Sequence, residues 1–166
     1  EYTPYQVNGY VQVSREALQD IPNIQSFVIG ELGEAIAKKE GQAFAIGDGS
    51  TSYGNITGLT NISGLTLTSA ASATAVTVDE LFDCASRLKV PYHANARFTF
   101  NRDTLFKIKQ LKTADNQYLW QPNVNALGES TLIGYGYFLS NDLEDMATGK
   151  KCIFFSDFSK GFVVVD

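Results

Sequence analysis

The chain is poor in the residues that catalytic and metal sites use. Its 166 residues include one histidine, one tryptophan and two cysteines. His93 has no second histidine or short-spaced cysteine motif with which to share a metal ion, so we expect a structural or surface role for it rather than catalysis. Cys84 and Cys152 lie far apart in the sequence, and we expect two buried free thiols instead of a disulfide framework.

The chain also lacks any run of about 18 apolar residues, which excludes a membrane-spanning helix. Its N-terminus has neither the basic nor the apolar region of a signal peptide, so we expect a soluble, intracellular protein whose sequons at Asn55 and Asn61 stay unmodified. The formal net charge is −5 and the pI about 4.8, so net charge does not favour binding to nucleic-acid phosphates.

Charge is missing altogether from residues 52–77, which contain no Lys, Arg, Asp or Glu and are rich in Gly, Ser, Thr and Ala. We expect short strands and turns on a surface, mobile in the isolated chain. The pentapeptides that begin at Asn55 and Asn61 nearly repeat each other, but their period is too short for a solenoid.

A long amphipathic helix is the strongest pattern that is present. Ser14 can cap a first helical turn at Arg15, and Pro22, two residues after Asp20, favours a restart of the helix. We therefore expect a helical rod over about residues 22–45. Its apolar stripe should contain the residues that recur at spacings of three and four, namely Ile24, Phe27, Val28, Leu32, Ala35 and Ile36.

Glycines shape both the rod and its end. Gly30, Gly33 and Gly41 each cost the rod about 1 kcal/mol of helix propensity, so we expect packing along its length to hold it. At Gly47-Asp48-Gly49 we expect a turn with positive φ. Residues 47–51 are not predicted to bind phosphate, because no lysine follows them and a helix ends there instead of beginning.

A second helix and a following strand are also indicated. Thr77 and Glu80 form a capping box, and Pro91 is expected to end the helix. The buried stripe of this helix should be Leu81, Phe82, Ala85 and Leu88. Next comes an alternating, half-buried strand in which the inward residues are Ala96, Phe98 and Phe100.

The remaining segments complete a sheet-centred arrangement. Asn101 can cap a third helix, whose apolar residues are Leu105, Ile108 and Leu111. Three further strands are expected, over residues 132–140, 151–155 and 161–165, with an exposed loop at 141–149.

Two carboxylate clusters remain as candidate sites. They are Asp142, Glu144 and Asp145 in the expected loop, and Asp79, Glu80 and Asp83 in the first turns of the second helix. The loop cluster lacks the ligand spacing of a calcium site, and negative charge at a helix start is favoured by the helix dipole alone. We therefore predict no metal ligand.

Four aromatic residues could form a stacking platform for bases or sugars: Tyr118, Trp120, Tyr135 and Tyr137. Without interleaved Lys or Arg, packing within a sheet or at a subunit contact is the favoured interpretation. The sequence therefore predicts no catalytic residue, no cofactor and no enzymatic activity.

Three blocks of sequence follow one another in an order typical of one protein family. They are residues 19–24 with 45–51 around the rod, residues 96–102 followed by 115–122, and residues 132–140 followed by 155–162. Together they resemble the major capsid proteins of tailed bacteriophages with the Hong Kong 97-like fold. Residues 58–59 depart from the family pattern, because the proline common there is absent.

The resemblance implies an α+β fold with a long spine helix in a peripheral lobe and a sheet-centred axial lobe flanked by helices. It assigns residues 1–53 to the end of an extended loop and the spine helix, and residues 54–166 to the axial domain. The family's N-terminal arm and its C-terminal return to the peripheral domain would lie outside this chain. We therefore expect a truncated, processed or prophage-derived form, in which no residue of an intersubunit cross-link can be assigned.

The function implied by the resemblance is structural. Such a subunit self-assembles, through pentamers and hexamers, into an icosahedral shell enclosing double-stranded DNA that it binds without sequence specificity. Scaffold, protease and portal proteins are the further partners, and the location is the virion capsid, or the bacterial host cytoplasm when the gene is carried by a prophage. Two alternatives stay open: an encapsulin-like nanocompartment shell, and a small ligand-binding or carbohydrate-binding module.

Overall fold

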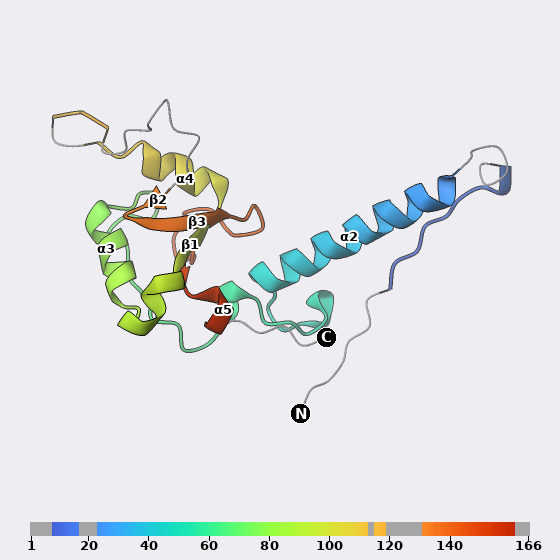
Figure 1. Cartoon of the computed structure of the whole chain (residues 1–166), viewed down its shortest axis with the longest axis horizontal. Coiled ribbons are helices and arrows are strands. Elements are labelled where there is room, and N and C mark those ends of the chain that lie inside the picture. Colours follow the sequence, from blue (N-terminus) through green and yellow to red (C-terminus); the bar gives the residue numbers. More distant parts are fainter. Residues whose placement is uncertain (1–7, 17–22, 113–114, 119–130, 162–166) are drawn as a thin grey trace. The chain divides into compact units, whose positions relative to one another are not determined.

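A computed structural model describes residues 8–16, 23–112, 115–118 and 131–161 of the chain (Figure 1). Helices and strands occur together, which confirms the predicted α+β class. The chain forms two compact units, Glu1–Ile62 and Ser63–Asp166, and each is described here by itself. Within the described residues, no helix combines the length and the apolar character that crossing a bilayer requires.

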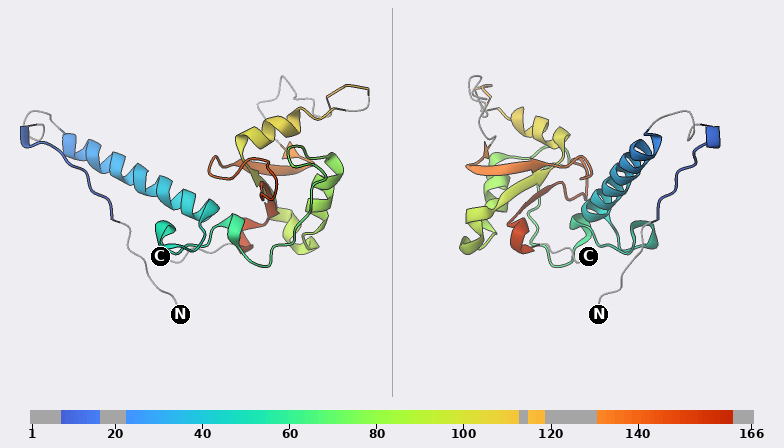
Figure 2. Two further views of the ribbon diagram at one scale, coloured as in Figure 1. Left: turned by 180° about the vertical axis from the view of Figure 1, so that it is seen from behind. Right: turned by 45° about the vertical axis from the view of Figure 1, so that its right-hand side comes forward.

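The first unit is dominated by the helix α2, Ile24–Ile46 (Figures 1 and 2). Its 23 residues correspond to a rod of about 35 Å, because an α-helix rises about 1.5 Å per residue. Arg15 and Glu16 are helical, as predicted, whereas Asp20 and Pro22 lie outside the described residues. Asn23 occupies the N-cap position with a left-handed φ of 66° and makes no side-chain capping bond.

Only part of the predicted apolar stripe is covered. The half-buried residues recur every four positions, at Ile24, Val28, Leu32 and Ile36, whereas Phe27 and Ala35 are exposed. Gly9 provides some of this cover. It lies so close to Leu32 that a Cβ added to Gly9 would be 2.6 Å from Cδ1 of Leu32. The packing within this chain therefore covers one narrow stripe of the rod and leaves the rest of its surface exposed. The buried side chains of α2 are Ala43 and Ala45, near its C-terminal end.

The end of α2 is held by residues 58–61, which include the 3-10 helix η2, Leu59–Asn61. The last carbonyls of any helix lack partners within it and must find them elsewhere. Here the Thr60 hydroxyl donates to the carbonyl of Ala45 at 3.3 Å, and the Asn61 side-chain amide donates to the carbonyls of Ile46 and Gly47 at 3.1 and 2.9 Å. The backbone N–H of Gly58 donates to the same Gly47 carbonyl at 2.8 Å.

Two glycines make this close crossing of backbones possible. A Cβ on Gly58 would lie 2.5 Å from the nitrogen of Gly47 and 2.7 Å from the carbonyl oxygen of Ala43. A Cβ on Gly47 would collide with the carbonyl oxygens of Ala43 and Ile56. Of the two glycines in the predicted turn, Gly49 has the positive φ, 79°, whereas Gly47 has a φ of −51°. A glycine is thus required at position 47 because neighbouring backbone atoms leave no room for a Cβ, and not because of its dihedral angles.

The uncharged segment after the turn does not form the predicted strands. It contains the 3-10 helices η1, Thr51–Tyr53, and η2. Its β-type pairing among the described residues is limited to one isolated bridge, between Asp48 and Thr57. From residue 65 to 76 the chain has no regular structure and is largely exposed. The near-repeat is not structural, because Gly58 sits in a crowded contact whereas Gly64 faces open space.

The second unit is built on a four-stranded sheet with the order β2-β3-β1-β4 (Figure 1). The strands are β1, Arg97–Phe100; β2, Thr131–Leu132; β3, Tyr135–Leu139; and β4, Ile153–Ser156. Strand β1 is parallel to β3 and antiparallel to β4, with Phe98 opposite Tyr137 and Phe155. The hairpin between β2 and β3 turns through Ile133 and Gly134, both at positive φ, as a two-residue type I′ turn requires.

Helices α3, Val78–Ser86, and α4, Arg102–Lys109, contribute buried side chains to the core that packs against this sheet. Further short elements are the 3-10 helix η3, Val90–Asn95, and α5, Phe158–Gly161. The alternation predicted for β1 is confirmed, since Phe98 and Phe100 are fully buried. The buried core cluster consists of Val76, Leu81, Ala85, Phe98, Phe100, Leu105, Ile108, Leu132 and Met146.

Several details of the predicted second unit are wrong. The run 132–140 is not one strand, because a turn at Ile133 and Gly134 separates β2 from β3. The loop 141–149 is not wholly exposed, because Leu143 and Met146 are buried. Phe82 is 53% exposed, because it lies on the solvent side of α3 and not with Leu81 and Ala85. Pro91 does not end α3, which stops at Ser86, but lies inside η3. Gly161 ends the helix α5 instead of beginning a strand, and the rest of that predicted strand lies outside the described residues.

Both helix caps predicted for the second unit are confirmed. The Thr77 hydroxyl accepts from the N–H of Glu80 at 3.3 Å, and the Glu80 carboxylate accepts from the N–H of Thr77 at 2.7 Å. The other oxygen of Glu80 accepts from the N–H of Ala71 at 2.6 Å, so this carboxylate also ties the preceding loop to α3. Asn101 caps α4 and donates its amide to the carbonyl of Leu143 at 2.7 Å.

Replacing Gly58 with alanine should destabilise the first unit by about 2–3 kcal/mol, because the new methyl group meets backbone atoms that cannot move aside. Gly33→Ala is the matched control. It adds the same methyl group within α2, where nothing lies within 4 Å, and should stabilise the helix by about 1 kcal/mol. Thermal unfolding followed by circular dichroism measures both changes, and equal effects of the two substitutions would contradict the crowded crossing at Gly58.

The Glu80 carboxylate should make the free energy of unfolding depend on pH in the acidic range. Hydrogen bonds from the N–H groups of Thr77 and Ala71 hold the pKa of Glu80 below its usual value of 4.5. Its contribution is therefore present above the unfolded-state pKa and is lost as pH falls through the folded-state pKa. Between about pH 5 and pH 3, wild type should lose more stability than Glu80→Gln, which cannot titrate. Asp79→Asn, which leaves these bonds intact, should retain the wild-type acid dependence. Parallel acid profiles for wild type and Glu80→Gln would disprove this role.

Candidate assembly surface

Large apolar side chains are exposed along the first unit. Phe27 is 66% and Ile29 is 70% exposed on α2, and Tyr10 and Val11 precede the helix at 88% and 50%. Exposed apolar groups gathered on one element mark interaction surfaces in soluble proteins. Phe27 and Ile29 are two positions apart and project from different sides of the helix, so the uncovered surface of α2 extends around both. We call this uncovered surface the exposed face of α2.

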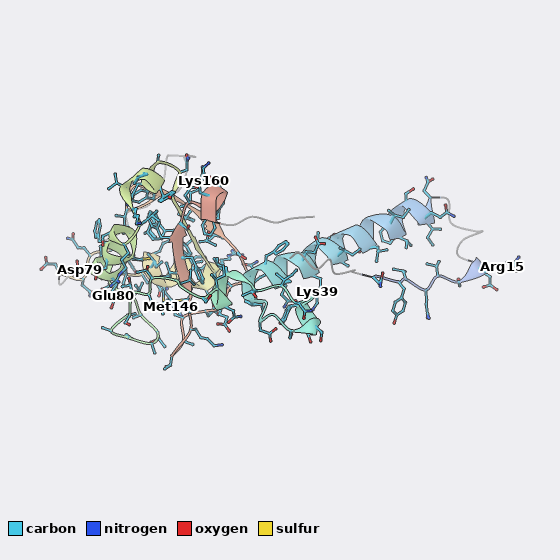
Figure 3. The ribbon with its side chains drawn as sticks, turned by 90° about the horizontal axis from the view of Figure 1, so that it is seen from below. Arg15, Lys39, Asp79, Glu80, Met146 and Lys160 are labelled. Atoms are coloured by element: carbon cyan, nitrogen blue, oxygen red, sulfur yellow. The ribbon has the colours of Figure 1, made fainter. Side chains whose placement is uncertain are left out.

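The charged side chains of α2 are also directed outward. Glu31, Glu34 and Lys38 are exposed, and Figure 3 shows side chains projecting from the helix along its length. Lys39, labelled there, instead helps to anchor the helix end, since its Nζ lies 5.5 Å from the ring centroid of Tyr53 in η1. An isolated helix with three internal glycines, Gly30, Gly33 and Gly41, is marginal in water, so a partner on this face would add the packing that the chain itself does not supply.

The histidine is part of the packing of the second unit. The Nε2 atom of His93 lies 2.8 Å from the carbonyl oxygen of Leu88, and its Nδ1 atom lies 2.8 Å from the hydroxyl of Tyr135. Because a carbonyl can only accept, Nε2 carries a proton, and in the neutral imidazole Nδ1 accepts from the Tyr135 hydroxyl. His93 also packs against Phe155 at a ring distance of 5.9 Å. Its structural role is as predicted.

The two thiols also behave as predicted. Cys84 and Cys152 are free and half-buried, and both pack against the core of the second unit. Burial raises the pKa of each thiol. At neutral pH both are therefore protonated and weakly nucleophilic.

The acidic clusters do not assemble into a site. Glu80 is engaged in the cap of α3, and Glu144 pairs with Lys150 at 2.5 Å. Within the described ranges, no three side chains of His, Cys, Asp or Glu are placed to share a metal ion. In the segment 47–51, the Asp48 carboxylate accepts from the N–H of Ser50 at 2.9 Å, an interaction internal to the turn.

The four aromatic residues do not form one platform. Tyr135 packs against Phe98 and Phe155, and Tyr137 stacks on Phe100 with ring centroids 5.4 Å apart. Their packing within the sheet is the interpretation favoured from the sequence. Tyr118 is 54% exposed beneath the Nζ of Lys112, and Trp120 lies outside the described residues.

Several residues that shape these units were not found from the sequence. Thr60 and Asn61 cap α2 from 14 or 15 residues away, a pairing that no local pattern marks. Asp157, buried at 6% exposure, accepts from the N–H and the hydroxyl of Ser159 and so starts α5. The Ser-Asp-Phe-Ser sequence at 156–159 carries the signal for this cap, since Asp is a favoured N-cap residue.

Comparison with known proteins identifies the family. The family model described as the phage capsid family matches residues 1–166, and the chain belongs to this family. Two solved structures with similar folds are the capsid of the empty GTA (gene transfer agent) particle and the capsid of the native GTA particle, each computed with C5 symmetry. Both are 26% identical to the chain, with TM-scores of 0.72 and 0.73. No curated protein matches it.

The matched structures are considerably longer than this chain. The likeness covers 87% of this chain and 53% of each GTA capsid chain. The chain therefore spans about half the length of these relatives, and the two compact units described above correspond to only part of such a subunit.

The double substitution Phe27→Ser and Ile29→Ser should leave the stability of the isolated chain within about 0.5 kcal/mol of wild type, because both side chains are already exposed. If the exposed face of α2 is an assembly surface, the same variant should lose self-association, measured by sedimentation velocity across a concentration series. Leu67→Ser, which removes an apolar group that is 58% exposed in the second unit, is the control. A large loss of stability in the double variant would show that α2 packs within its own chain.

Proposed function

We propose that the chain is a major capsid subunit that self-assembles into an icosahedral shell around double-stranded DNA in a tailed phage, a prophage or a phage-derived particle. The observation that carries the proposal is membership of the phage capsid family over residues 1–166. The likeness to capsids of GTA particles supports it. Its role is structural, and the shell itself is the functional unit.

The proposal extends to the parts of the subunit. We assign residues 1–53 to the end of an extended loop and the spine helix of a peripheral domain, and residues 54–166 to an axial domain. The exposed α2 supports the first assignment, and the sheet with the helices that share its core supports the second. Compact packing divides the chain after Ile62, so the segment that caps α2 belongs to the first unit.

The partners proposed are further copies of the chain, in pentamers and hexamers, together with scaffold, protease and portal proteins. Modest contacts repeated by symmetry can close a shell without any strong single interface. Packaged DNA would be enclosed without sequence-specific binding. The location would be the virion, and the host cytoplasm during expression from a prophage.

Expression of the complete reading frame together with its neighbouring genes tests the proposal. Electron microscopy should show closed particles, and the DNA inside should survive nuclease treatment until the particles are disrupted. Closed particles with protein cargo and no protected DNA would instead indicate an encapsulin-like compartment. A chain that stays monomeric at all concentrations with its neighbouring genes present would contradict a shell role altogether.

A further inference from the structure

One strip of the exposed face of α2 is aromatic and acidic. Phe27, Glu31 and Glu34 follow one another at spacings of four and three residues, so they share one side of the helix. All three are exposed. Lys38 continues the strip one turn further along and is the nearest positive charge on it. We call Phe27, Glu31 and Glu34 the acidic strip.

Helix α4 carries a strip of the same spacing and opposite charge. Arg102, Phe106 and Lys109 also follow at four and three residues and share one side of α4. Arg102 and Phe106 are exposed, Lys109 is half-buried, and the guanidinium carbon of Arg102 lies 5.7 Å from the ring centroid of Phe106. We call these three residues the basic strip. Its length, like that of the acidic strip, is about two helical turns, or roughly 10 Å.

The two strips belong to units of different charge. The first unit contains three of the 13 basic residues and seven of the 18 acidic residues, a net charge of −4 that accounts for most of the chain's −5. In the second unit the charges nearly balance, and residues 102–112 contain four basic residues and one acidic residue. Nearby charges act most strongly, because the Debye length is about 10 Å at 0.1 M salt.

Cyclic assemblies require two different, complementary surfaces on each subunit. In a ring, each copy meets the next head to tail, so the surface on one side must fit a distinct surface on the other side. An acidic strip meeting its own copy would place like charges together, as would a basic strip, and such contacts are unfavourable. The charges therefore disfavour a symmetric pairing of either strip with itself and favour a head-to-tail contact.

We propose that the acidic strip of one copy docks against the basic strip of a second copy, so that Phe27 and Phe106 are both buried in the contact. Exposed ion pairs contribute little by themselves, so burial of the two rings supplies most of the affinity. The opposite charges set the register and reject the wrong partner surface. The inference rests on the proposed shell function and names the surfaces by which neighbouring copies recognise each other.

A charge exchange tests the pairing in the complete gene product. Arg102→Glu with Lys109→Glu should reduce particle yield at least tenfold, because two favourable juxtapositions become repulsive. Glu31→Lys with Glu34→Lys should do the same. Combining all four substitutions should restore assembly, since the pairs are opposite again. The control, Lys89→Glu with Lys160→Glu, makes the same change in net charge on exposed residues of the second unit and should leave the yield unchanged.

Disulfide trapping tests the contact without requiring a closed shell. A chain with Glu34→Cys, mixed with a chain carrying Arg102→Cys, should form mixed dimers on oxidation several times more readily than a mixture of Glu34→Cys with Lys160→Cys. The native thiols, Cys84 and Cys152, are half-buried, and burial raises the pKa of each and disfavours the reactive thiolate. They therefore compete weakly with the introduced cysteines for disulfide formation.

The outcomes separate the two proposals. Wild-type particles unaffected by either charge reversal would overturn the docking proposal and leave the shell function standing. Absence of wild-type particles contradicts the shell function, and equal trapping at Arg102 and Lys160 then overturns the docking contact as well. Binding of double-stranded DNA by wild type, lost in the Arg102 and Lys109 reversal without any effect on assembly, would assign the basic strip to DNA instead.

Discussion

The backbone crossing between Gly47 and Gly58 is the constraint on which the first unit depends. It brings the N–H of Gly58 to the carbonyl of Gly47, and it places Thr60 and Asn61 at the open end of α2. With its final carbonyls satisfied there, a helix of 23 residues can extend from one anchored end while most of its length stays uncovered. The contacts at the C-terminal end of α2 therefore anchor the helix whose exposed surface a neighbouring molecule would meet.

Local signals in the sequence were sufficient to predict several elements of the second unit. The capping box of Thr77 and Glu80, the cap at Asn101 and the alternation at Phe98 and Phe100 each depend on residues a few positions apart. The cover of α2, the exposure of Phe82 and the capping by Asn61 depend on contacts across many residues. Hydrophobic periodicity shows which face is apolar, but it cannot tell whether the chain itself or another molecule covers that face.

The same distinction applies to the candidate surface. The sequence pattern correctly marked Phe27 as apolar, and it failed only in assigning the residue to the chain's own core. For a member of the phage capsid family this error is informative, because subunits of a shell bury part of their apolar surface between copies. Residues that break the expectations for an isolated globular chain are those best suited to intersubunit contacts.

The central position of β1 has a consequence for how the chain is made. Its two neighbours, β3 and β4, come much later in the sequence, and pairing over such separations closes long loops and is slow. During synthesis Phe98 and Phe100 therefore emerge before any strand that can pair with β1 exists. The second unit passes through a period in which the two most deeply buried phenylalanines of its central region are unprotected, and crowded synthesis of many copies makes this interval the point of greatest risk for aggregation.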